Sequence, residues 1–299
     1  MAQTAESTGA AIPLRREATW LQTSALGRLL RIKLAVFGLT VVTISVLAAV
    51  LGPVLAPYGP TEFAGDSAEQ PFTTSRILGT DILGRDQLTR LLYGARASLQ
   101  VGLSAVAIGF SVGTSVGLSA AYFKGAVDSV LMRIVDAMLS LPGLVLPLTL
   151  LAALGGGINT VSLALGIAFI PGIARLMRGQ AFAQLERDYV LAAIAAGAST
   201  RRIMFRHVAP NTMAPIIVAA SLGMSVAVIA EAGLSFLGVG VTPPTATWGT
   251  MLSLGFQNIR TQPWLVFAPA SSIFLLVISI NFIGDGLRDV LDPRLRGGI

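Results

Sequence analysis

Three acidic side chains, Asp136, Glu231 and Asp285, lie in or beside long apolar stretches of this sequence. A carboxylate inside a membrane is costly, so such residues commonly belong to proton relays or ion pathways. Asp136 and Asp285 each have an arginine three residues away, Arg133 and Arg288, in position to neutralise the acid on one helix face. The three acids also fall at different depths. A proton-coupled secondary carrier therefore stays open as one interpretation of these acids. An aspartyl protease is disfavoured, because it would need two carboxylates at one depth.

Sequence signatures of the common enzyme classes are absent. The only lysines are Lys33, followed by Leu34, and Lys124, followed by Gly125, so there is no G-x-x-x-x-G-K-[ST] phosphate loop. The H-E-x-x-H and G-x-S-x-G signatures are also missing. The chain has no cysteine and one histidine, His207, which excludes Cys-liganded and multi-histidine metal sites. We therefore expect no catalytic residue, no metal site and no cofactor in this chain.

The segment from Tyr189 to Asn211 combines small residues with arginines between two apolar stretches. It predicts a short helix over 188–196 whose small side chains would let a partner approach the backbone closely. Gly197 is predicted to end this helix, and Ser199 is predicted to cap a second, basic helix. Docking on another protein is the favoured interpretation, and contact with anionic lipid is the alternative.

The composition is that of an integral membrane protein. Only 12% of the 299 residues are charged and the mean hydropathy is +0.75, whereas about a quarter of the residues of a soluble domain are charged. The net charge of +6 would suggest a nucleic-acid partner in a soluble chain. Here the basic residues flank apolar stretches, where they set orientation in a bilayer, so nucleic-acid binding is not expected.

Six apolar stretches are each long enough to cross a hydrocarbon core of about 30 Å. They predict spanning helices at 34–56, 98–122, 130–154, 160–177, 213–230 and 264–283. The first is longer than the apolar region of a cleaved signal peptide, which is about 7–15 residues. We expect a cytoplasmic segment at 1–33, a transmembrane domain at 34–288 and a cytoplasmic tail at 289–299, with a long external loop at 57–97.

Basic residues are divided unequally between the two sides that six spans create. Five of the 21 fall on one side, and these are Arg76, Arg85, Arg90, Arg96 and Arg260. The other sixteen are Arg15, Arg16, Arg28, Arg31, Lys33, Lys124, Arg133, Arg175, Arg178, Arg187, Arg201, Arg202, Arg206, Arg288, Arg294 and Arg296. The positive-inside rule places this larger set in the cytoplasm, together with both termini and the Tyr189–Asn211 segment.

The second predicted span carries small residues at strict four-residue intervals, namely Ala105, Gly109, Gly113, Gly117 and Ala121. Residues four apart share one helix face, so they form a smooth ridge that permits close helix packing. Packing within this chain is favoured over a subunit interface or a role in lining a pore.

Prolines and glycines interrupt the later apolar stretches. Pro142 and Pro147 in the third span and Pro171 in the fourth remove backbone hydrogen bonds and predict kinks. From 231 to 252 the sequence EAGLSFLGVGVTPPTATWGTML predicts a broken or re-entrant segment on the external side. The candidate gate residues of this segment are Glu231, Ser235, Phe236 and Trp248.

Four blocks, at 78–103, 189–211, 231–252 and 285–296, together resemble the C-type permease subunit of dipeptide, oligopeptide and nickel importers. These importers belong to the binding-protein-dependent ABC importers, whose "EAA" loop has paired alanines, a glycine four residues after the second alanine, and a hydrophobic-Pro ending. The matching positions here are Ala192, Ala193, Gly197 and Pro210. This chain departs from the pattern at Leu191, where the family frequently has an acidic residue.

The resemblance implies an all-α integral membrane protein with six transmembrane helices, a type I ABC importer permease fold and a cytoplasmic coupling helix. It implies a heterodimer with a B-type permease subunit, two ATPase subunits that hold ATP and Mg, and an external substrate-binding protein, in the inner membrane of a bacterium. The implied cargo is a short peptide, with nickel or another small solute as the alternative. Residues implied to contact the ATPases are Tyr189, Ala192, Ala193, Gly197, Ala198, Arg201 and Arg202.

Overall fold

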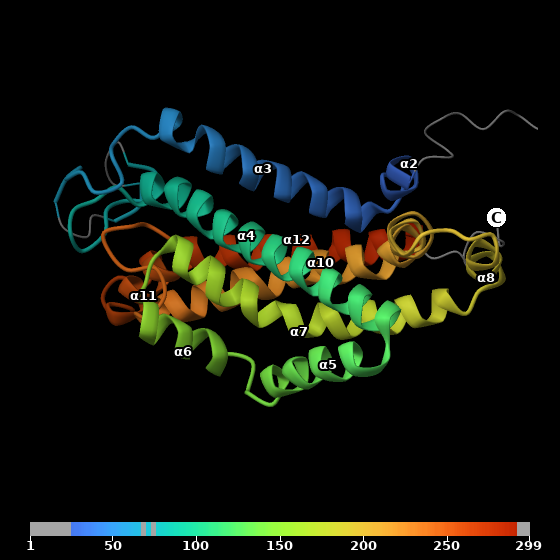
Figure 1. The fold of residues 1–299 in the computed structure, drawn as a ribbon. Coiled ribbons are helices and arrows are strands. Elements are labelled where there is room, and N and C mark those ends of the chain that lie inside the picture. Colours follow the sequence, from blue (N-terminus) through green and yellow to red (C-terminus); the bar gives the residue numbers. More distant parts are fainter. Residues whose placement is uncertain (1–24, 67–69, 73–75, 292–299) are drawn as a thin grey trace, which may run out of the picture.

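The computed structural model describes residues 25–66, 70–72 and 76–291, and these residues are almost entirely helical (Figure 1). The one β contact among them is an isolated antiparallel bridge between Thr80 and Asp86. The predicted all-α class is confirmed.

Five long helices form an elongated bundle. They are α3 (Lys33–Leu55), α4 (Gln87–Phe123), α7 (Ile158–Leu185), α10 (Ala209–Phe236) and α12 (Trp264–Leu291). Each is long and apolar enough to cross a membrane, with α10 taken together with the helical residues that precede it from Thr200. The shorter elements are α2 (Ala25–Leu29), α5 (Gly125–Leu139), α6 (Val145–Leu154), α8 (Asp188–Ala195), α9 (Thr200–Arg202), the π-helix η1 (Ile203–Val208) and α11 (Trp248–Gln257).

The bundle has two distinct ends (Figure 1). α2 and α8 lie at one, which we call the α8 end. α11 and the loop between α3 and α4 lie at the other, which we call the α11 end. The Tyr189–Asn211 segment and the broken segment after Glu231 are therefore separated by the full length of the bundle.

Several helices extend beyond the predicted spans. α4 begins at Gln87 and not at residue 98, so the loop before it ends at Asp86 and not at 97. α7 continues to Leu185, and the helix that contains α10 begins thirteen residues before the predicted span. Counting apolar residues finds the part of a helix that suits hydrocarbon, whereas the helical backbone continues into the polar region beyond it.

The third predicted span, 130–154, is wrong as a single helix. The structure divides it into α5 and α6, which are separated by residues 140–144. Pro142 and Gly143 lie in this break, where proline disfavours a helical conformation in the residue before it and cannot donate a backbone hydrogen bond. Pro147 falls in the first turn of α6, where its missing N–H has no helical partner to lose.

The small-residue ridge of α4 lies against α7, and these two helices form the most extensively packed pair in the bundle. A Cβ atom added at Gly113 would lie 2.8 Å from the backbone oxygen of Ile170 and 2.8 Å from Ile173 Cβ. A Cβ added at Gly109 would lie 2.5 Å from Phe169 Cβ, and one at Gly117 would lie 2.8 Å from Met177 Cβ. The glycines therefore let the two helix backbones approach within this chain.

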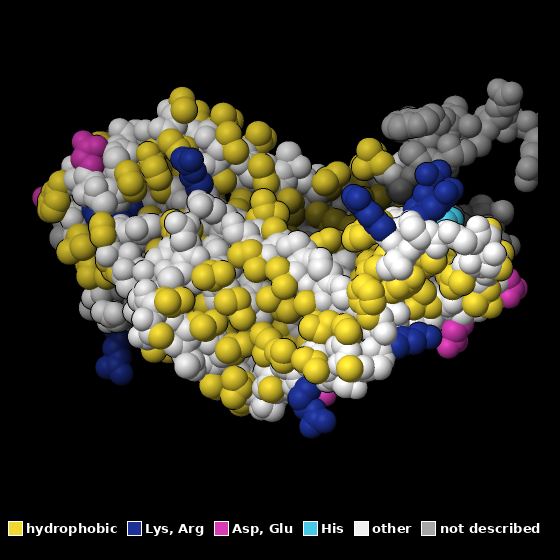
Figure 2. Space-filling view, in the orientation of Figure 1, with side chains coloured by type: hydrophobic (Ala, Val, Ile, Leu, Met, Phe, Trp, Pro, Cys, Tyr) yellow, Lys and Arg dark blue, Asp and Glu magenta, His cyan; other side chains and the backbone are white. Residues whose placement is uncertain are grey.

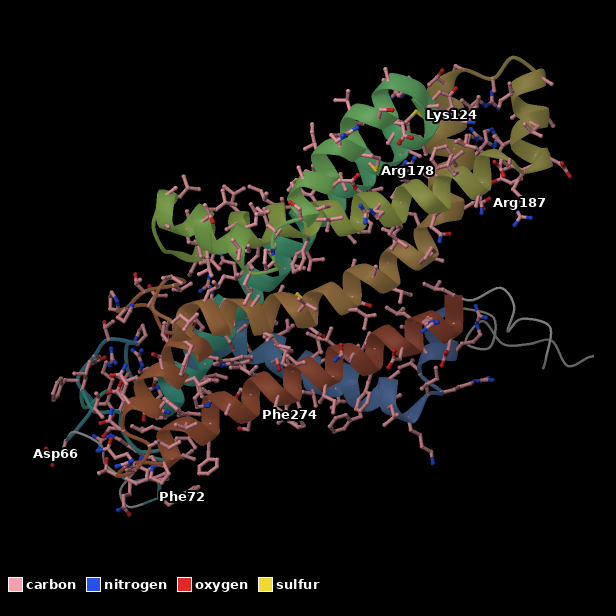
Figure 3. All side chains as sticks on the ribbon, turned by 90° about the horizontal axis from the view of Figure 1, so that it is seen from below. Asp66, Phe72, Lys124, Arg178, Arg187 and Phe274 are labelled. Carbon is pink, nitrogen blue, oxygen red and sulfur yellow. The ribbon has the colours of Figure 1, made fainter. Side chains whose placement is uncertain are left out.

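Apolar side chains also cover the outside of the bundle. On the face in Figure 2, hydrophobic side chains occupy the middle, and most charged side chains gather toward the two ends. Phe267 and Phe274 on α12 are 70% and 63% exposed, and Phe274 points away from the neighbouring helices (Figure 3). An apolar surface of this extent suits a lipid environment better than water.

Candidate functional site

At the α8 end, α8 packs on the bundle through one fully buried side chain and exposes the opposite face. Val190 is fully buried in a cluster that includes Met177 of α7, Met204 of η1 and Ile216 of α10. Ala192 is exposed and Ala193 is half-buried. α8 is therefore attached to three other helices while it presents small side chains outward.

α8 ends in a glycine conformation that the sequence predicts. Gly197 has φ of +75°. Its N–H donates to the Ile194 carbonyl (2.9 Å), and the Ala198 N–H donates to the Ala193 carbonyl (3.0 Å). This pair of hydrogen bonds defines a Schellman motif, whose glycine position disfavours side chains with a Cβ atom. Ser199 occupies the predicted N-cap position of α9, but the predicted side-chain capping hydrogen bond is not formed.

The exposed face of α8 is apolar where the family pattern frequently has an acid. Leu191 and Ile194 are 51% and 49% exposed, and Phe205 of η1 is 64% exposed. Arg201 and Arg202 of α9 are also exposed. The surface therefore offers apolar contacts beside positive charge, and Leu191 provides no ionic anchor of the kind that an acid would supply.

Tyr189 connects the elements on either side of α8. Its hydroxyl lies 2.9 Å from Gln184 Oε1 on α7 and 3.2 Å from the backbone oxygen of His207 on η1. η1 passes directly into α10, so α9, η1 and α10 form one continuous helical segment. The π-helical turn between the basic residues and the membrane helix was not predicted, because its wider winding leaves no distinct mark in apolar spacing.

At the α11 end, Glu231 is fully buried and ties together two helices that are distant in sequence. One carboxylate oxygen accepts a hydrogen bond from Ser98 Oγ of α4 (2.9 Å), and the other accepts one from Ser235 Oγ of α10 (2.8 Å). Ser235 Oγ in turn accepts the N–H of Val241 (3.0 Å), and Ser98 Oγ lies 3.4 Å from the N–H of Trp248. We call these five residues the Glu231 cluster.

The Glu231 cluster positions the broken segment that the sequence predicts. α10 ends at Phe236, an irregular stretch follows, and α11 begins at Trp248. Trp248 is 3% exposed and its indole N–H donates to the Leu91 carbonyl of α4 (3.1 Å). Phe236 packs edge-on against Phe256 of α11, with ring centroids 5.5 Å apart. The four predicted gate residues therefore lie at one end of the bundle, where α4, α10 and α11 meet.

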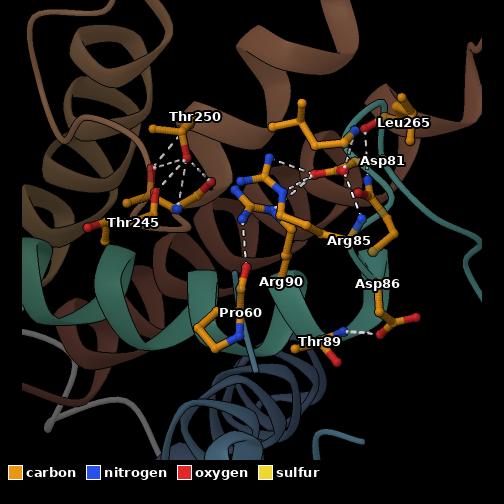
Figure 4. A network of polar contacts seen from close by, with 12 residues as sticks. Pro60, Asp81, Arg85, Asp86, Thr89, Arg90, Thr245, Thr250 and Leu265 are labelled. Carbon is orange, nitrogen blue, oxygen red and sulfur yellow. Dashed lines mark hydrogen bonds and ion pairs between the residues drawn. The ribbon is translucent and has the colours of Figure 1, made fainter. Parts of the chain in front are cut away.

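A further polar network at the same end was not predicted from the residues (Figure 4). Asp81 Oδ2 accepts a hydrogen bond from Arg85 Nε (2.7 Å) and lies 3.5 Å from Arg90 Nε. Arg90 Nη1 donates to the Pro60 carbonyl (2.8 Å), and Asp86 caps α4 by accepting the Thr89 N–H (2.7 Å). The network fixes the loop after α3 onto the start of α4, and the close spacing of Asp81, Arg85 and Asp86 was its only sequence signal.

The acidic residues near the spans have partners that differ from the predicted ones. Asp136 on α5 pairs with Arg175 on α7 and not with Arg133. Asp285 forms no ion pair with Arg288 in the described part of the chain. These contacts disfavour a shared proton relay, because no two of the three acids meet.

A second ion pair joins α5 to α7. Asp128 accepts two hydrogen bonds from Arg178 (2.5 and 2.6 Å), and this guanidinium lowers the pKa of the Asp128 carboxyl. The Arg178 guanidinium also lies 4.7 Å from the ring centroid of Phe182, and Lys124 Nζ lies 6.0 Å from the same centroid. Arg178 and Lys124 are labelled in Figure 3. α5 is therefore held to α7 by charge as well as by packing.

This arrangement, a membrane bundle with a short helix exposed at one end and a broken segment at the other, fits a transport subunit. Residues 113–297 match the family described as the binding-protein-dependent transport system inner membrane component. Residues 21–74 match the N-terminal transmembrane domain of oligopeptide transport permease C. The chain belongs to the family of binding-protein-dependent transport system inner membrane components.

Individual relatives are similar in sequence to this chain along most of their length. The chain is 45% identical over 272 residues to the dipeptide transport system permease protein DppC of Escherichia coli (strain K12), covering 89% of this chain and 91% of the relative. It is 43% identical over 268 residues to the di/tripeptide transport system permease protein DppC of Pseudomonas aeruginosa, covering 88% of each. The dipeptide permease protein of Alkalihalophilus pseudofirmus is 40% identical over 264 residues, covering 88% of this chain and 87% of that protein.

Proposed function

We propose that this chain is the C-type permease subunit of an ATP-driven importer of short peptides. The observation that carries this proposal is identity of 40–45% over most of the chain to permeases named for dipeptide or di/tripeptide transport. The exposed α8 and the broken segment at the opposite end supply the two features that such a subunit needs. The chain forms half of the translocation pathway and performs no covalent chemistry itself.

The partners follow from this role. A homologous B-type permease subunit completes the pathway, two cytoplasmic ATPase subunits with ATP and Mg drive it, and an external binding protein delivers the peptide. The unequal distribution of basic residues supports an orientation with both termini and the α8 end in the cytoplasm and the α11 end outside. The ATPases then contact α8 and α9, through Tyr189, Ala192, Ala193, Gly197, Ala198, Arg201 and Arg202.

The packing of α8 supplies a mechanism for coupling. When the ATPases close on ATP, they displace α8, and buried Val190 carries that displacement into η1, α7 and α10. α10 runs from η1 to Phe236 and holds Glu231 near its far end. A tilt of α10 therefore acts directly on the Glu231 cluster and on the broken segment that follows it. The cavity opens alternately to the two sides of the membrane as this helix moves.

The proposal is tested by reconstituting the complete system. The chain is co-expressed with a candidate B-type subunit and candidate ATPase subunits, purified, and placed in proteoliposomes with the matching binding protein. We expect uptake of a labelled dipeptide that requires ATP and the binding protein. ATP-dependent uptake of nickel or another solute without peptide uptake would replace the proposed cargo. Uptake driven by a proton gradient without ATPase subunits would replace the mechanism.

A further inference from the structure

A pocket of about 360 Å³ opens at the α11 end, beside the Glu231 cluster. Three separate parts of the chain form most of its wall: the loop after α3, one face of α4, and the stretch between α10 and α11. Its lining includes Pro60, Tyr93, Arg96, Gln100 and Thr245. Its volume lies in the range of about 300–1,000 Å³ that is typical of small-molecule sites.

Arg96 supplies the positive charge of this pocket. Tyr93, Arg96 and Gln100 follow the spacing i, i+3, i+7, so they share one face of α4. Arg96 is exposed, and no carboxylate of the described residues pairs with it. By contrast, the nearby Arg85 and Arg90 both form ion pairs with Asp81. A guanidinium without an anion, set in a concavity with a phenol and an amide, matches the planar geometry of a carboxylate.

The walls of the pocket are held in place before anything binds. Arg90 Nη1 donates to the Pro60 carbonyl (2.8 Å), which fixes the loop after α3. Thr250 Oγ1 lies 3.0 Å from the Thr247 carbonyl oxygen and 3.3 Å from the Thr245 carbonyl oxygen, and it accepts the Thr247 N–H (2.9 Å). These contacts together fix the stretch before α11. The contacts of Arg90 with Pro60 and of Thr250 with Thr245 are drawn in Figure 4. Because these segments are already ordered, a ligand would not have to spend binding free energy on ordering them.

We propose that this pocket is a subsite for the carboxylate of a short peptide, with Arg96 as its cationic group. This inference rests on the proposed function and places one contact of the cargo at the α11 end of this subunit. A pocket of this volume suits one end of a small peptide, whereas a docked protein covers about 800 Å² on each partner. Two of its walls are irregular backbone, which is not exposed to lipid hydrocarbon, so the pocket opens to water.

The test uses the natural absence of cysteine in this chain, so that labelling of this subunit reports on one introduced thiol. Thr245→Cys places one thiol in the pocket, and Thr245 contributes only its backbone oxygen to the contact with Thr250. The assembled transporter in nanodiscs, without binding protein, reacts with N-ethylmaleimide, a neutral reagent, at increasing concentrations of dialanine. We expect dialanine to slow the reaction and dialanine amide to leave it unchanged.

Arg96→Gln, combined with Thr245→Cys, identifies the group responsible. It should raise the dialanine concentration for half-maximal protection by about tenfold, because a neutral amide replaces a charge-assisted contact. Arg260→Gln is the matched control, since Arg260 is exposed in the turn after α11 and does not line the pocket. It should leave protection unchanged.

Four results would overturn the subsite. Equal protection by dialanine with and without Arg96→Gln would remove the guanidinium from the site, and equal protection by dialanine amide would remove the carboxylate from recognition. Protection by the unliganded binding protein but not by dialanine would assign the pocket to protein docking. A labelling rate that follows the anionic lipid content and ignores dialanine would assign it to lipid.

Peptide uptake is measured separately, on the transporter without these substitutions. Failure of that uptake would count against the proposed function and not against the labelling result, because the labelling requires neither ATP nor transport. The two proposals can therefore fail independently.

Discussion

Glu231 accepts hydrogen bonds from two serine hydroxyls, and each hydroxyl faces a backbone N–H on its other side. A serine hydroxyl has one hydrogen and two lone pairs, so each serine can accept the backbone N–H and still donate to the carboxylate. Both carboxylate oxygens of Glu231 then act as acceptors. A glutamine of the same shape keeps only one oxygen as an acceptor, so the serine that meets its NH₂ group would have to turn its hydrogen away from this buried acceptor.

We expect Glu231→Gln to destabilise the subunit by about 1–3 kcal/mol, the usual cost of leaving a buried polar group unsatisfied. The measurement is the thermal unfolding of the detergent-purified complex. Glu186→Gln makes the same chemical change at an exposed position just after α7 and serves as the control. Equal unfolding temperatures for the two variants would contradict the assigned network.

Gly197 sets the end of α8 through its backbone conformation. No atom lies within 4 Å of a Cβ added there, so a larger side chain fits and only the φ of +75° resists it. Holding valine in this backbone conformation should cost roughly 1–2 kcal/mol at the end of α8. We expect Gly197→Val to reach the membrane at a near-normal level but to lower both ATP-dependent uptake and co-purification of the ATPase subunits. Gly197→Asn should retain most activity, because asparagine tolerates this conformation. Full uptake by the valine variant would remove α8 from the coupling mechanism.

Among the elements, α4 and α7 depend on backbone contact at the small-residue ridge. Gly113→Leu would push a branched side chain against Ile170 and Ile173, and overpacking of this kind typically costs about 1–3 kcal/mol. Val112→Leu adds the same residue at the neighbouring, 42% exposed position. We expect Gly113→Leu, but not Val112→Leu, to lower the thermal unfolding temperature of the purified complex. Similar values for both variants would show that the helices tolerate separation.

α5 and α6 show how one apolar stretch becomes two elements. The apolar content of 130–154 is sufficient for one span, but Pro142 and Gly143 lie between the two helices. α5 is then attached to α7 by the Asp128–Arg178 and Asp136–Arg175 pairs. Local backbone chemistry ended the helix, and its place depends on packing against α4 and α7 as well as on these two ion pairs.

For the whole molecule, the orientation in the membrane is the prediction with the widest consequences. Ser199 lies at the α8 end and Thr61 in the loop at the α11 end, and both are exposed. Ser199→Cys should react with an impermeant maleimide only after cells are permeabilised, whereas Thr61→Cys should react in intact bacteria whose outer barrier admits the reagent. Labelling of Ser199→Cys in intact cells would invert the topology and remove α8 from the reach of ATP.

Patterns along the chain were enough to predict the membrane class, a long apolar helix at five of the six predicted spans, the short helix before Gly197 and the small-residue ridge. Each of these depends on composition, spacing or backbone preference within a contiguous stretch, and such properties can be counted in a sequence. The ends of the helices were predicted less well, because the helical backbone continues beyond the apolar stretch that marks it in the sequence.

Which residues meet could be learned only from the packed bundle. The ridge of α4 lies against α7, Asp136 pairs with Arg175 in preference to the nearer Arg133, and Glu231 bonds to Ser98 across 133 positions. The Arg96 pocket is likewise built from segments that are far apart in the sequence. Such contacts depend on the rotation and depth of whole helices relative to one another, and these are set by the packing of all their side chains together.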